Sequence, residues 1–298
     1  MKIGYIGLGK MGYNMVLRLL EQKWEVVVSN KTVKEVEELA GKGAIPAKSV
    51  QGLVQALTPP RLIWLMVPYQ AVDEVIGELL SYLQKGDTLI DGGNSPYKES
   101  MRRAKELEEK GIDFLDVGTS GGPGGARSGA CCMIGGKEEV FEKFEKLFQA
   151  ISAKDAYGYM GESGAGHFVK MVHNGIEYGM MQSLAEGFEI MKKVPFDLSL
   201  EKVADLYNHR SVVESRLVGW LKDGYAKHGQ ELKGISGSVE QGGEGMWTVE
   251  TAKELGVNAP IIEGAVNFRA QSQKDPSYAG KVLSLLRNQF GGHEVKEK

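Results

Sequence analysis

Short apolar segments alternate with amphipathic stretches over the first 160 residues of the chain. The first apolar segment starts at Lys2, and the later ones that predict buried strands lie at 62–67, 87–91, 112–117 and 130–134. Stretches with helical periodicity follow them at 70–82, 97–110 and 137–150. This alternation is typical of a doubly wound α/β sheet, which we expect to end near residue 158.

The pattern changes to continuous helical periodicity from residue 164 onward. One long helix is predicted at about 164–193, where Pro195 follows it, and shorter ones at about 199–208, 213–227, 246–256, 260–272 and 277–289. The stretch GESGAGH (161–167) is interpreted as a hinge. The sequence therefore predicts an α/β domain at 1–160 and an all-α C-terminal domain at 161–298, with a frayed charged tail.

The predicted long helix carries an unusual polar stripe. At about 100° per residue, Lys170, His173, Asn174, Glu177 and Tyr178 fall within roughly 140° of its circumference. A solvated face would explain such a stripe. However, the rest of the helix surface is apolar, which favours a buried helix whose stripe lines an internal cleft. A buried lysine or glutamate is costly unless it is paired, so the stripe is a candidate functional site.

A glycine-rich turn follows the first strand. Gly7, Gly9 and Gly12 form a Gly-x-Gly-x-x-Gly pattern between a strand and an amphipathic helix, and a second strand ends near Asn30. In this context the pattern predicts a Rossmann-type dinucleotide site, in which the glycines let the backbone approach a pyrophosphate at the helix N-terminus. The expected cofactor-binding residues of this turn are Gly7, Leu8, Gly9, Lys10, Met11 and Gly12.

The end of the second strand bears on the choice of dinucleotide. NAD sites usually carry a carboxylate there for the ribose 2′-hydroxyl. This chain has Asn30, Lys31 and Thr32, and no carboxylate before Glu35. A cation between two hydrogen-bonding residues suits a 2′-phosphate, so the sequence predicts NADP in preference to NAD.

Two glycine-rich loops are expected to follow strand ends farther along the chain. They are DGGNS (91–95) and DVGTSGGPGG (116–125), and both carry hydroxyl or amide side chains. Because ligands of such sheets bind beyond the carboxyl ends of the strands, the two segments are predicted to form the floor of a polar ligand site.

Length, charge and the pattern of apolar and cysteine residues indicate which classes of protein this chain can belong to. The chain has 298 residues and a net charge of −3, which argues against a nucleic-acid partner. There is no apolar run of 18 residues, and the strand that starts at Lys2 leaves no room for a targeting peptide. Adjacent Cys131 and Cys132 are interpreted as small buried residues of a reducing compartment. A cytoplasmic protein without a membrane partner is expected.

Several segments together resemble one enzyme family. GLGKMG, DGGNS, SGGPGGARSG, GHFVKMVHNGIEYG and RNQFGGH occur in the order found in 6-phosphogluconate dehydrogenases, and the chain looks like their short form. The resemblance implies oxidative decarboxylation of 6-phosphogluconate to ribulose 5-phosphate and carbon dioxide, in the pentose phosphate pathway. The wider β-hydroxyacid dehydrogenase superfamily shares the first three segments and a catalytic lysine.

The resemblance also implies roles for individual residues. Lys170 matches the general base and Glu177 the general acid. The groups that match those holding the sugar acid are Asn94, Ser120, Gly121, Gly122, His173 and Asn174. The phosphate binders are matched by Tyr178, Arg269, Arg287 and His293, of which the last two would come from the tail of a partner in a homodimer. The cofactor wall is matched by Met66, Val67 and Pro68, and Asn94 is also expected to border the cofactor.

The sequence departs from the pattern of this family at two positions, and two alternative functions stay open. Gly242 occupies the position of a phosphate-binding lysine of the long-form enzymes, and Lys31 stands where NADP-dependent members favour arginine. A non-decarboxylating dehydrogenase of the hydroxyisobutyrate type would keep Lys170 without needing Glu177 or Arg287. A non-catalytic, NADP-binding redox sensor would need none of them. No His/Asp/Glu cluster with metal-ligand spacing is evident, so the reaction is expected to be metal-independent.

Overall fold

The computed structural model describes residues 1–240 and 242–295. The chain forms two compact units, of which the first is Met1–Met171 and the second starts at Val172. The boundary falls inside one continuous helix, α9 (Ala165–Lys193). Helix α9 therefore belongs to both units, and it starts where the sequence predicted.

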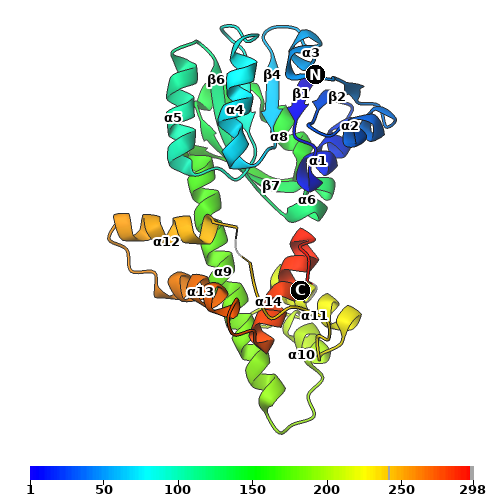
Figure 1. Cartoon of the computed structure of the whole chain (residues 1–298), viewed down its shortest axis with the longest axis vertical. Coiled ribbons are helices and arrows are strands. Elements are labelled where there is room, and N and C mark those ends of the chain that lie inside the picture. The colour runs from blue at the N-terminus through cyan, green and yellow to red at the C-terminus, as the bar shows by residue number, and fades with distance from the viewer. Residues whose placement is uncertain (241, 296–298) are drawn as a thin grey trace. The chain divides into compact units, whose positions relative to one another are not determined.

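The first unit is built on one eight-stranded sheet in the order β3-β2-β1-β4-β5-β6-β7-β8. All neighbouring strands are parallel except β6 and β7. Helices flank the sheet in Figure 1, which explains why most of its strands are continuous apolar runs. The strands are β1 (Lys2–Ile6), β2 (Glu25–Ser29), β3 (Ile45–Pro46), β4 (Leu62–Leu65), β5 (Thr88–Asp91), β6 (Asp113–Ser120), β7 (Ala130–Gly136) and β8 (Ser152–Gly161). The predicted doubly wound α/β sheet is confirmed.

The helices of this unit include those that were predicted and three, at 33–40, 50–55 and 122–128, that the sequence analysis did not predict. In chain order, the helices are α1 (Lys10–Glu21), α2 (Val33–Ala40), α3 (Val50–Gln55), α4 (Tyr69–Leu80), α5 (Tyr97–Glu108), α6 (Gly122–Ser128), α7 (Glu138–Lys143) and α8 (Glu145–Ile151). The helix predicted at 137–150 is two helices, because Phe144 leaves the helical conformation. The second glycine-rich segment is not a loop: its first half is strand β6 and its second half is helix α6.

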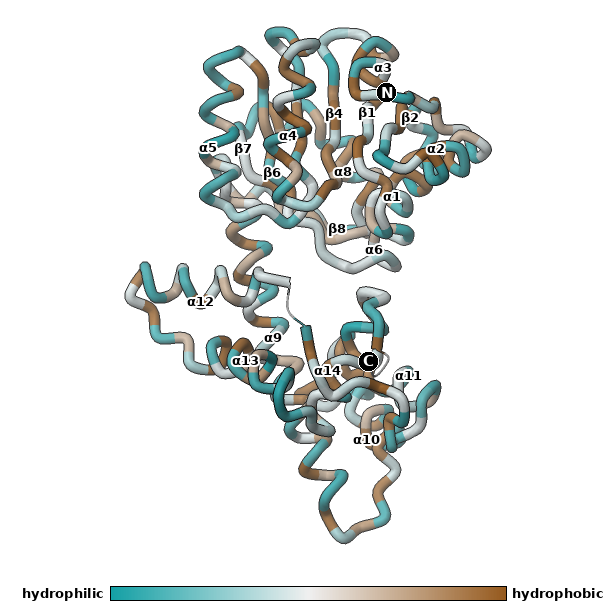
Figure 2. The backbone as a smooth tube through the Cα atoms, viewed as in Figure 1, coloured by the Kyte–Doolittle hydropathy of each residue, from teal (hydrophilic) through white to brown (hydrophobic). Residues whose placement is uncertain are grey.

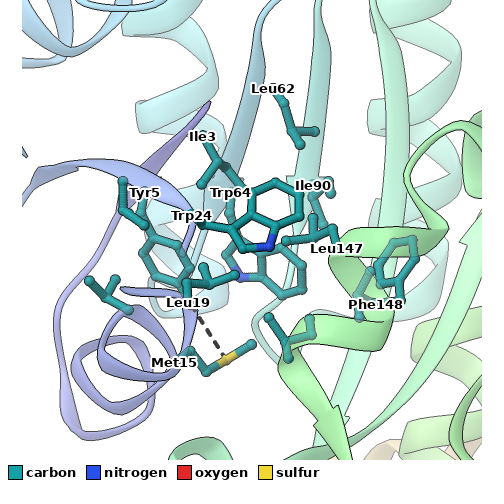
Figure 3. Packing of buried hydrophobic residues seen from close by; sticks show 14 of the residues in the cluster. Ile3, Tyr5, Met15, Leu19, Trp24, Leu62, Trp64, Ile90, Leu147 and Phe148 are labelled. Atoms are coloured by element: carbon teal, nitrogen blue, oxygen red, sulfur yellow. Dashed lines mark hydrogen bonds between the residues drawn. The ribbon is translucent and has the colours of Figure 1, made fainter. Parts of the chain in front are cut away.

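The core of the first unit lies on both faces of the sheet. Ile3, Tyr5 and Trp64 belong to one buried cluster, whereas Ile6 and Ile63 belong to another. Successive side chains of a strand point to opposite faces, so the two clusters are the two sides of the sheet. Figure 3 shows the first cluster, in which the Tyr5 ring stacks on Trp64 and its hydroxyl donates to the sulfur of Met15.

The second unit is helical, as predicted. After α9 it contains α10 (Leu200–Tyr207), α11 (Arg216–His228), α12 (Glu244–Glu254), α13 (Pro260–Ser272) and α14 (Tyr278–Gly291). Figure 2 shows hydrophobic and hydrophilic positions alternating along these helices. The apolar faces of α9, α10, α11 and α14 meet in a core that includes Phe188, Leu221 and Leu285. Val249 of α12 and Val266 of α13 pack with Tyr178 in a smaller cluster. Gly224 of α11 lets that helix approach Leu285 of α14 closely.

Over the described part of the chain, every helix is too short or too polar to cross a membrane.

The expectation that both cysteines are buried is wrong for one of them. Cys132 is 1% exposed, but its neighbour Cys131 is exposed. Adjacent residues of a strand face opposite sides of the sheet, so only one of the two side chains enters the core. Burial raises the pKa of the Cys132 thiol to about 12.

The two thiols are expected to differ in reactivity. At pH 8 a thiol with a pKa near 12 is about one part in ten thousand thiolate, the reactive form. Titration of the native protein with an aromatic disulfide reagent should detect one fast thiol per chain, and two after unfolding in guanidinium. Cys131→Ser should remove the fast reaction. Two fast thiols in the native protein would contradict this assignment.

Candidate active site

The turn between β1 and α1 has the geometry of a pyrophosphate cradle. A Cβ at Gly7, whose φ is +99°, would collide with the carbonyl of Met66, and a Cβ at Gly12 would collide with the carbonyl of Gly7. Gly9 differs, because a Cβ there would meet nothing within 4 Å. The outer glycines are therefore required by packing, whereas Gly9 keeps the approach to the helix N-terminus open for a ligand. The turn fits a dinucleotide.

The other residues predicted to bind the cofactor here lie between the glycines of the turn. Leu8 is buried, Met11 packs against the core, and Lys10 starts α1. Across the turn, the Met66 N–H donates to the carbonyl of Ile6 at 2.7 Å. The predicted cofactor wall, Met66, Val67 and Pro68, continues from β4 to the first residue of α4.

The residues after β2 form a hydrogen-bonded group that the sequence analysis did not foresee. The Leu8 N–H donates to Asn30 Oδ1 at 3.1 Å, which fixes Asn30 to the glycine turn. Asn30 Nδ2 donates to Thr32 Oγ1 at 2.8 Å and to Glu35 Oε2 at 3.2 Å. The Thr32 hydroxyl also donates to Glu35. A carboxylate thus lies among the predicted cofactor residues.

The DGGNS segment follows β5 as a loop and is anchored by the buried Asp91. This carboxylate accepts from the Gly93 N–H at 3.2 Å and from the Ser95 hydroxyl at 2.7 Å. Arg103 of α5 donates to Ser95 at 3.2 Å and lies 3.4 Å from Asp91. These contacts fix the loop on both sides of Asn94, one of the predicted ligand residues.

His167 connects this loop to α9. The sequence analysis assigned it no role. It is 1% exposed, and its Nε2 donates to the Gly93 carbonyl at 2.9 Å. Its Nδ1 is hydrogen-bonded to the Ser100 hydroxyl at 2.7 Å. The only sequence signal was its position, three residues before Lys170.

The start of α9 is fixed by Asp116 of β6, a second residue that the sequence analysis missed. Its carboxylate accepts from the Gly164 N–H at 2.6 Å and from the His167 N–H at 2.8 Å, and its side chain is fully buried. A carboxylate at a helix N-terminus satisfies N–H groups that have no partner within the helix and interacts favourably with the helix dipole.

Lys170 lies one turn farther along α9 and is 6% exposed. Its stem packs against Gly118 of β6, where a Cβ would overlap Lys170 Cβ and come within 2.8 Å of the Gly166 carbonyl. Strand β6 ends at Ser120. Gly121 and Gly122, with φ of +122° and +61°, then turn the chain into α6. Strand β6 thus carries the groove for Lys170 and, at its end, the predicted substrate residue Ser120.

The other residues of the polar stripe lie in the second unit. His173 Nδ1 is 3.0 Å from Asn174 Oδ1 and 3.9 Å from the Glu177 carboxylate. None of the five stripe residues is exposed, so the interpretation of a solvated face is wrong. The apolar side is less covered than expected, because Ile176 and Met180 are 53% and 45% exposed in the single chain.

Tyr178 and Arg269 form a buried pair in the second unit. The Arg269 guanidinium carbon lies 3.3 Å from the centroid of the Tyr178 ring, and the residues are 3% and 7% exposed, respectively. Gly245 leaves room for the ring, and the Gly242 N–H donates to the Tyr178 hydroxyl at 3.3 Å. Burial lowers the pKa of Arg269 to about 10, so this guanidinium remains a cation at neutral pH.

Arg287 of α14 lies in the same electrostatic surroundings. Burial lowers its pKa, and the nearby Tyr178, Glu244 and Glu177 act in the opposite direction. Three of the four predicted phosphate binders are therefore grouped within one chain. His293 follows α14 and is exposed; its ring lies against Gly291, and its carbonyl accepts from Asn288 at 2.8 Å.

Across residues 1–240 and 242–295, no three His, Cys, Asp or Glu side chains are grouped so as to hold a metal ion.

The fold and the glycine turn define a dinucleotide-binding dehydrogenase with a helical second domain. Residues 2–164 match the NAD binding domain of 6-phosphogluconate dehydrogenase, and residues 166–294 match the 6-phosphogluconate dehydrogenase C-terminal domain. The chain belongs to the 6-phosphogluconate dehydrogenase family.

Three relatives illustrate this membership. YqeC of Bacillus subtilis is 45% identical over 100% of both chains. The NAD(+)-dependent, decarboxylating 6-phosphogluconate dehydrogenase of Haloferax volcanii is 40% identical over 100% of this chain and 99% of its own. The structure of Plasmodium falciparum 6-phosphogluconate dehydrogenase, studied with NADP+ and with 6-phosphogluconate, is 33% identical with a TM-score of 0.82; the match covers 91% of this chain and 62% of that one.

The close approach of β6 to α9 can be tested with Gly118→Ala. The added methyl group would displace the stem of Lys170, so we expect turnover to fall at least tenfold, because small displacements of a catalytic group are costly. Gly77→Ala is the matched control, since a Cβ there would meet nothing within 4 Å. Steady-state kinetics and melting temperatures check both variants. Wild-type turnover in a folded Gly118→Ala protein would contradict this role of β6.

Proposed function

We propose that this protein oxidises and decarboxylates 6-phosphogluconate to ribulose 5-phosphate and carbon dioxide, with reduction of NAD or NADP. The observation that carries the proposal is a buried lysine, Lys170, on the helix that also bears Glu177. In the family to which the chain belongs, the matching positions hold the general base and the general acid. The spacing of seven residues is two helical turns, or roughly 10 Å of rise.

The first step needs a base for the substrate hydroxyl. Oxidation of a secondary alcohol removes the hydroxyl proton together with a hydride, which the nicotinamide ring accepts when it is bound. Lys170 in its neutral form would take the proton, and burial of an amine favours the neutral form. The His167–Gly93 hydrogen bond and the Asp116 cap would hold this lysine and the Asn94 loop in place.

The second step needs a cation and then an acid. The oxidised sugar carries a ketone β to its carboxylate, and loss of carbon dioxide leaves the electron pair as an enolate. The Lys170 ammonium formed in the first step would stabilise the enolate oxygen. Glu177 would then protonate the carbon, which gives the ketose. The metal-independence expected from the sequence remains a prediction.

The buried Arg269 and the half-buried Arg287 favour a phosphorylated substrate over hydroxyisobutyrate. Arg269 and Arg287 place two guanidinium groups beside Tyr178, and guanidinium binds phosphate oxygens in a bidentate manner. A small unphosphorylated hydroxy acid would leave these cations without a partner of matching charge. Two arginines would also compensate for Gly242, where long-form enzymes carry a lysine. We therefore assign Tyr178, Arg269 and Arg287 to the phosphate.

Loss of Lys170 tests the catalytic proposal. With 6-phosphogluconate and either NAD or NADP, the wild type should increase the absorbance at 340 nm. A chelator should not change this rate. Lys170→Ala should lower kcat about a thousandfold, as expected for loss of a general base, and leave dinucleotide binding within threefold. Lys170→Met fills the same space and should be equally inactive. Turnover within tenfold of wild type in either variant would refute the proposal.

We propose that the protein is a homodimer. Ile176 and Met180 of α9 and Ile261 of α13 are exposed in the single chain, and such apolar side chains suit a contact with a second copy. The sequence analysis expected Arg287 and His293 to act in the partner's site. Because Arg287 already lies near Tyr178 and Glu177 of its own chain, we assign it to that chain. The contribution of His293 to a partner remains a prediction.

Subunit mixing distinguishes the two arrangements of Arg287. A hybrid of Lys170→Ala and Arg287→Ala subunits contains one complete site only if Arg287 acts across the dimer. We expect no activity above that of the two parent variants, with exchange verified by native mass spectrometry. Recovery toward half of the wild-type rate per hybrid would show instead that the arginine crosses to the partner.

A further inference from the structure

The group formed by Asn30, Thr32 and Glu35 lies near the expected position of the adenosine ribose, where NAD carries a 2′-hydroxyl and NADP a 2′-phosphate. In a doubly wound sheet, the adenosine ribose lies beyond the end of the second strand, which here is β2. Asn30 is tied to the glycine turn by its bond from the Leu8 N–H, so the group is fixed relative to the pyrophosphate cradle. Its chemistry therefore bears directly on the ribose 2′-position.

The donors of this group converge on a carboxylate. Asn30 Nδ2 and the Thr32 hydroxyl both donate to Glu35 Oε2. These bonds lower the pKa of the Glu35 carboxyl, with the Thr32 hydrogen bond as the largest cause, so it is ionised at neutral pH. A 2′-phosphate placed here would meet a negative charge, and the donors that could bind it already have an acceptor.

The cation on which the NADP expectation depended also has another partner. Lys31 Nζ lies 3.9 Å from the carboxylate of Glu74 on α4, and both side chains are largely exposed. An exposed pair of this kind is weak. Lys31 therefore adds a screened positive charge at this position. Glu35 is also partly exposed and adds a negative charge, which the side chains of Asn30 and Thr32 hold in place.

Helix capping accounts for only part of this geometry. Thr32 and Glu35 have the spacing of a capping box, in which the threonine side chain accepts from the backbone N–H three residues later. Here Thr32 makes no such bond at the start of α2, and its hydroxyl donates to the carboxylate instead. A backbone hydrogen bond at Glu35 itself also lowers the pKa of this carboxyl, so the carboxylate binds the first turn of the helix as well as the side chains of Asn30 and Thr32.

We propose that Glu35 sets the dinucleotide preference of this protein in favour of NAD. Its carboxylate accepts from the ribose 2′-hydroxyl and repels a 2′-phosphate. This replaces the preference for NADP that Asn30, Lys31 and Thr32 suggested on their own. The inference depends on the dinucleotide site of the proposed function, but not on the sugar acid that the enzyme oxidises.

Binding of cofactor fragments tests this without turnover. Isothermal titration calorimetry at 0.15 M salt would compare 5′-AMP with 2′,5′-ADP, which differ only in the 2′-phosphate. The proteins are the wild type, Glu35→Gln and Glu37→Gln. Glu37 is an exposed residue of α2, about 200° around the helix from Glu35, so its variant makes the same change of charge away from the ribose.

The wild type should bind 5′-AMP at least as tightly as 2′,5′-ADP. Glu35→Gln should tighten 2′,5′-ADP about fivefold to tenfold, as expected for removing one charge near a dianion, with 5′-AMP changed by less than threefold. Glu37→Gln should change both by less than twofold.

Three results would overturn the inference: a wild type that prefers 2′,5′-ADP tenfold, an unchanged Kd for 2′,5′-ADP in Glu35→Gln, or equal changes in both Glu variants. The affinities of the wild type for 5′-AMP and 2′,5′-ADP test the inference even if Glu35→Gln does not fold. Inactivity toward 6-phosphogluconate would refute the proposed substrate and leave these binding results intact.

Discussion

The buried carboxylate of Asp116 fixes the part of the structure on which the proposed chemistry depends. It accepts from two N–H groups at the start of α9, and such charge-assisted bonds are roughly twice as strong as neutral ones. The cap sets where α9 begins, and the glycines at 118 and 166 set how closely the helix approaches β6. Together they determine the position of Lys170. A helix whose start could shift by one residue would rotate this lysine by about 100°.

The same cap links the helix to the DGGNS loop. His167 receives its backbone position from Asp116 and uses its ring to hold the Gly93 carbonyl, while Asp91 and Arg103 hold the other side of that loop. The side chains of Asp91, Arg103, Asp116 and His167 are all buried and hydrogen-bonded, which makes the arrangement stiff. The base on α9 and the amide of Asn94 are therefore positioned by one continuous network rather than by separate elements.

Much of this architecture could be predicted from the sequence, because burial on both faces of a parallel sheet leaves an unmistakable apolar pattern. The glycine turn was equally clear, because a Gly-x-Gly-x-x-Gly pattern between a strand and a helix is typical of a dinucleotide site. Strands β3 and β8 were missed because they lie at the two edges of the sheet, where β3 is only two residues long and β8 is only partly buried. His167 and Asp116 were missed for another reason. Each acts through a partner that only the folded backbone brings near, and spacing along the chain does not reveal such a pair. Glu35 lies near its partners in sequence, but its capping-box spacing from Thr32 did not indicate that the carboxylate would accept from both Asn30 and Thr32.

Placing Arg269 and Arg287 near Tyr178 in the second unit costs free energy, which binding of the proposed phosphate ligand would offset. Desolvation is the largest cause of the lowered pKa of Arg269, and the neighbouring Arg287 adds repulsion between like charges. Stacking on the Tyr178 ring recovers part of this cost, because a guanidinium over an aromatic face is attracted to it. The stack is possible only because Gly245 leaves space for the ring. A fold optimised for stability alone would not place a second arginine near the desolvated Arg269, so this arrangement supports the proposed binding of a dianionic ligand.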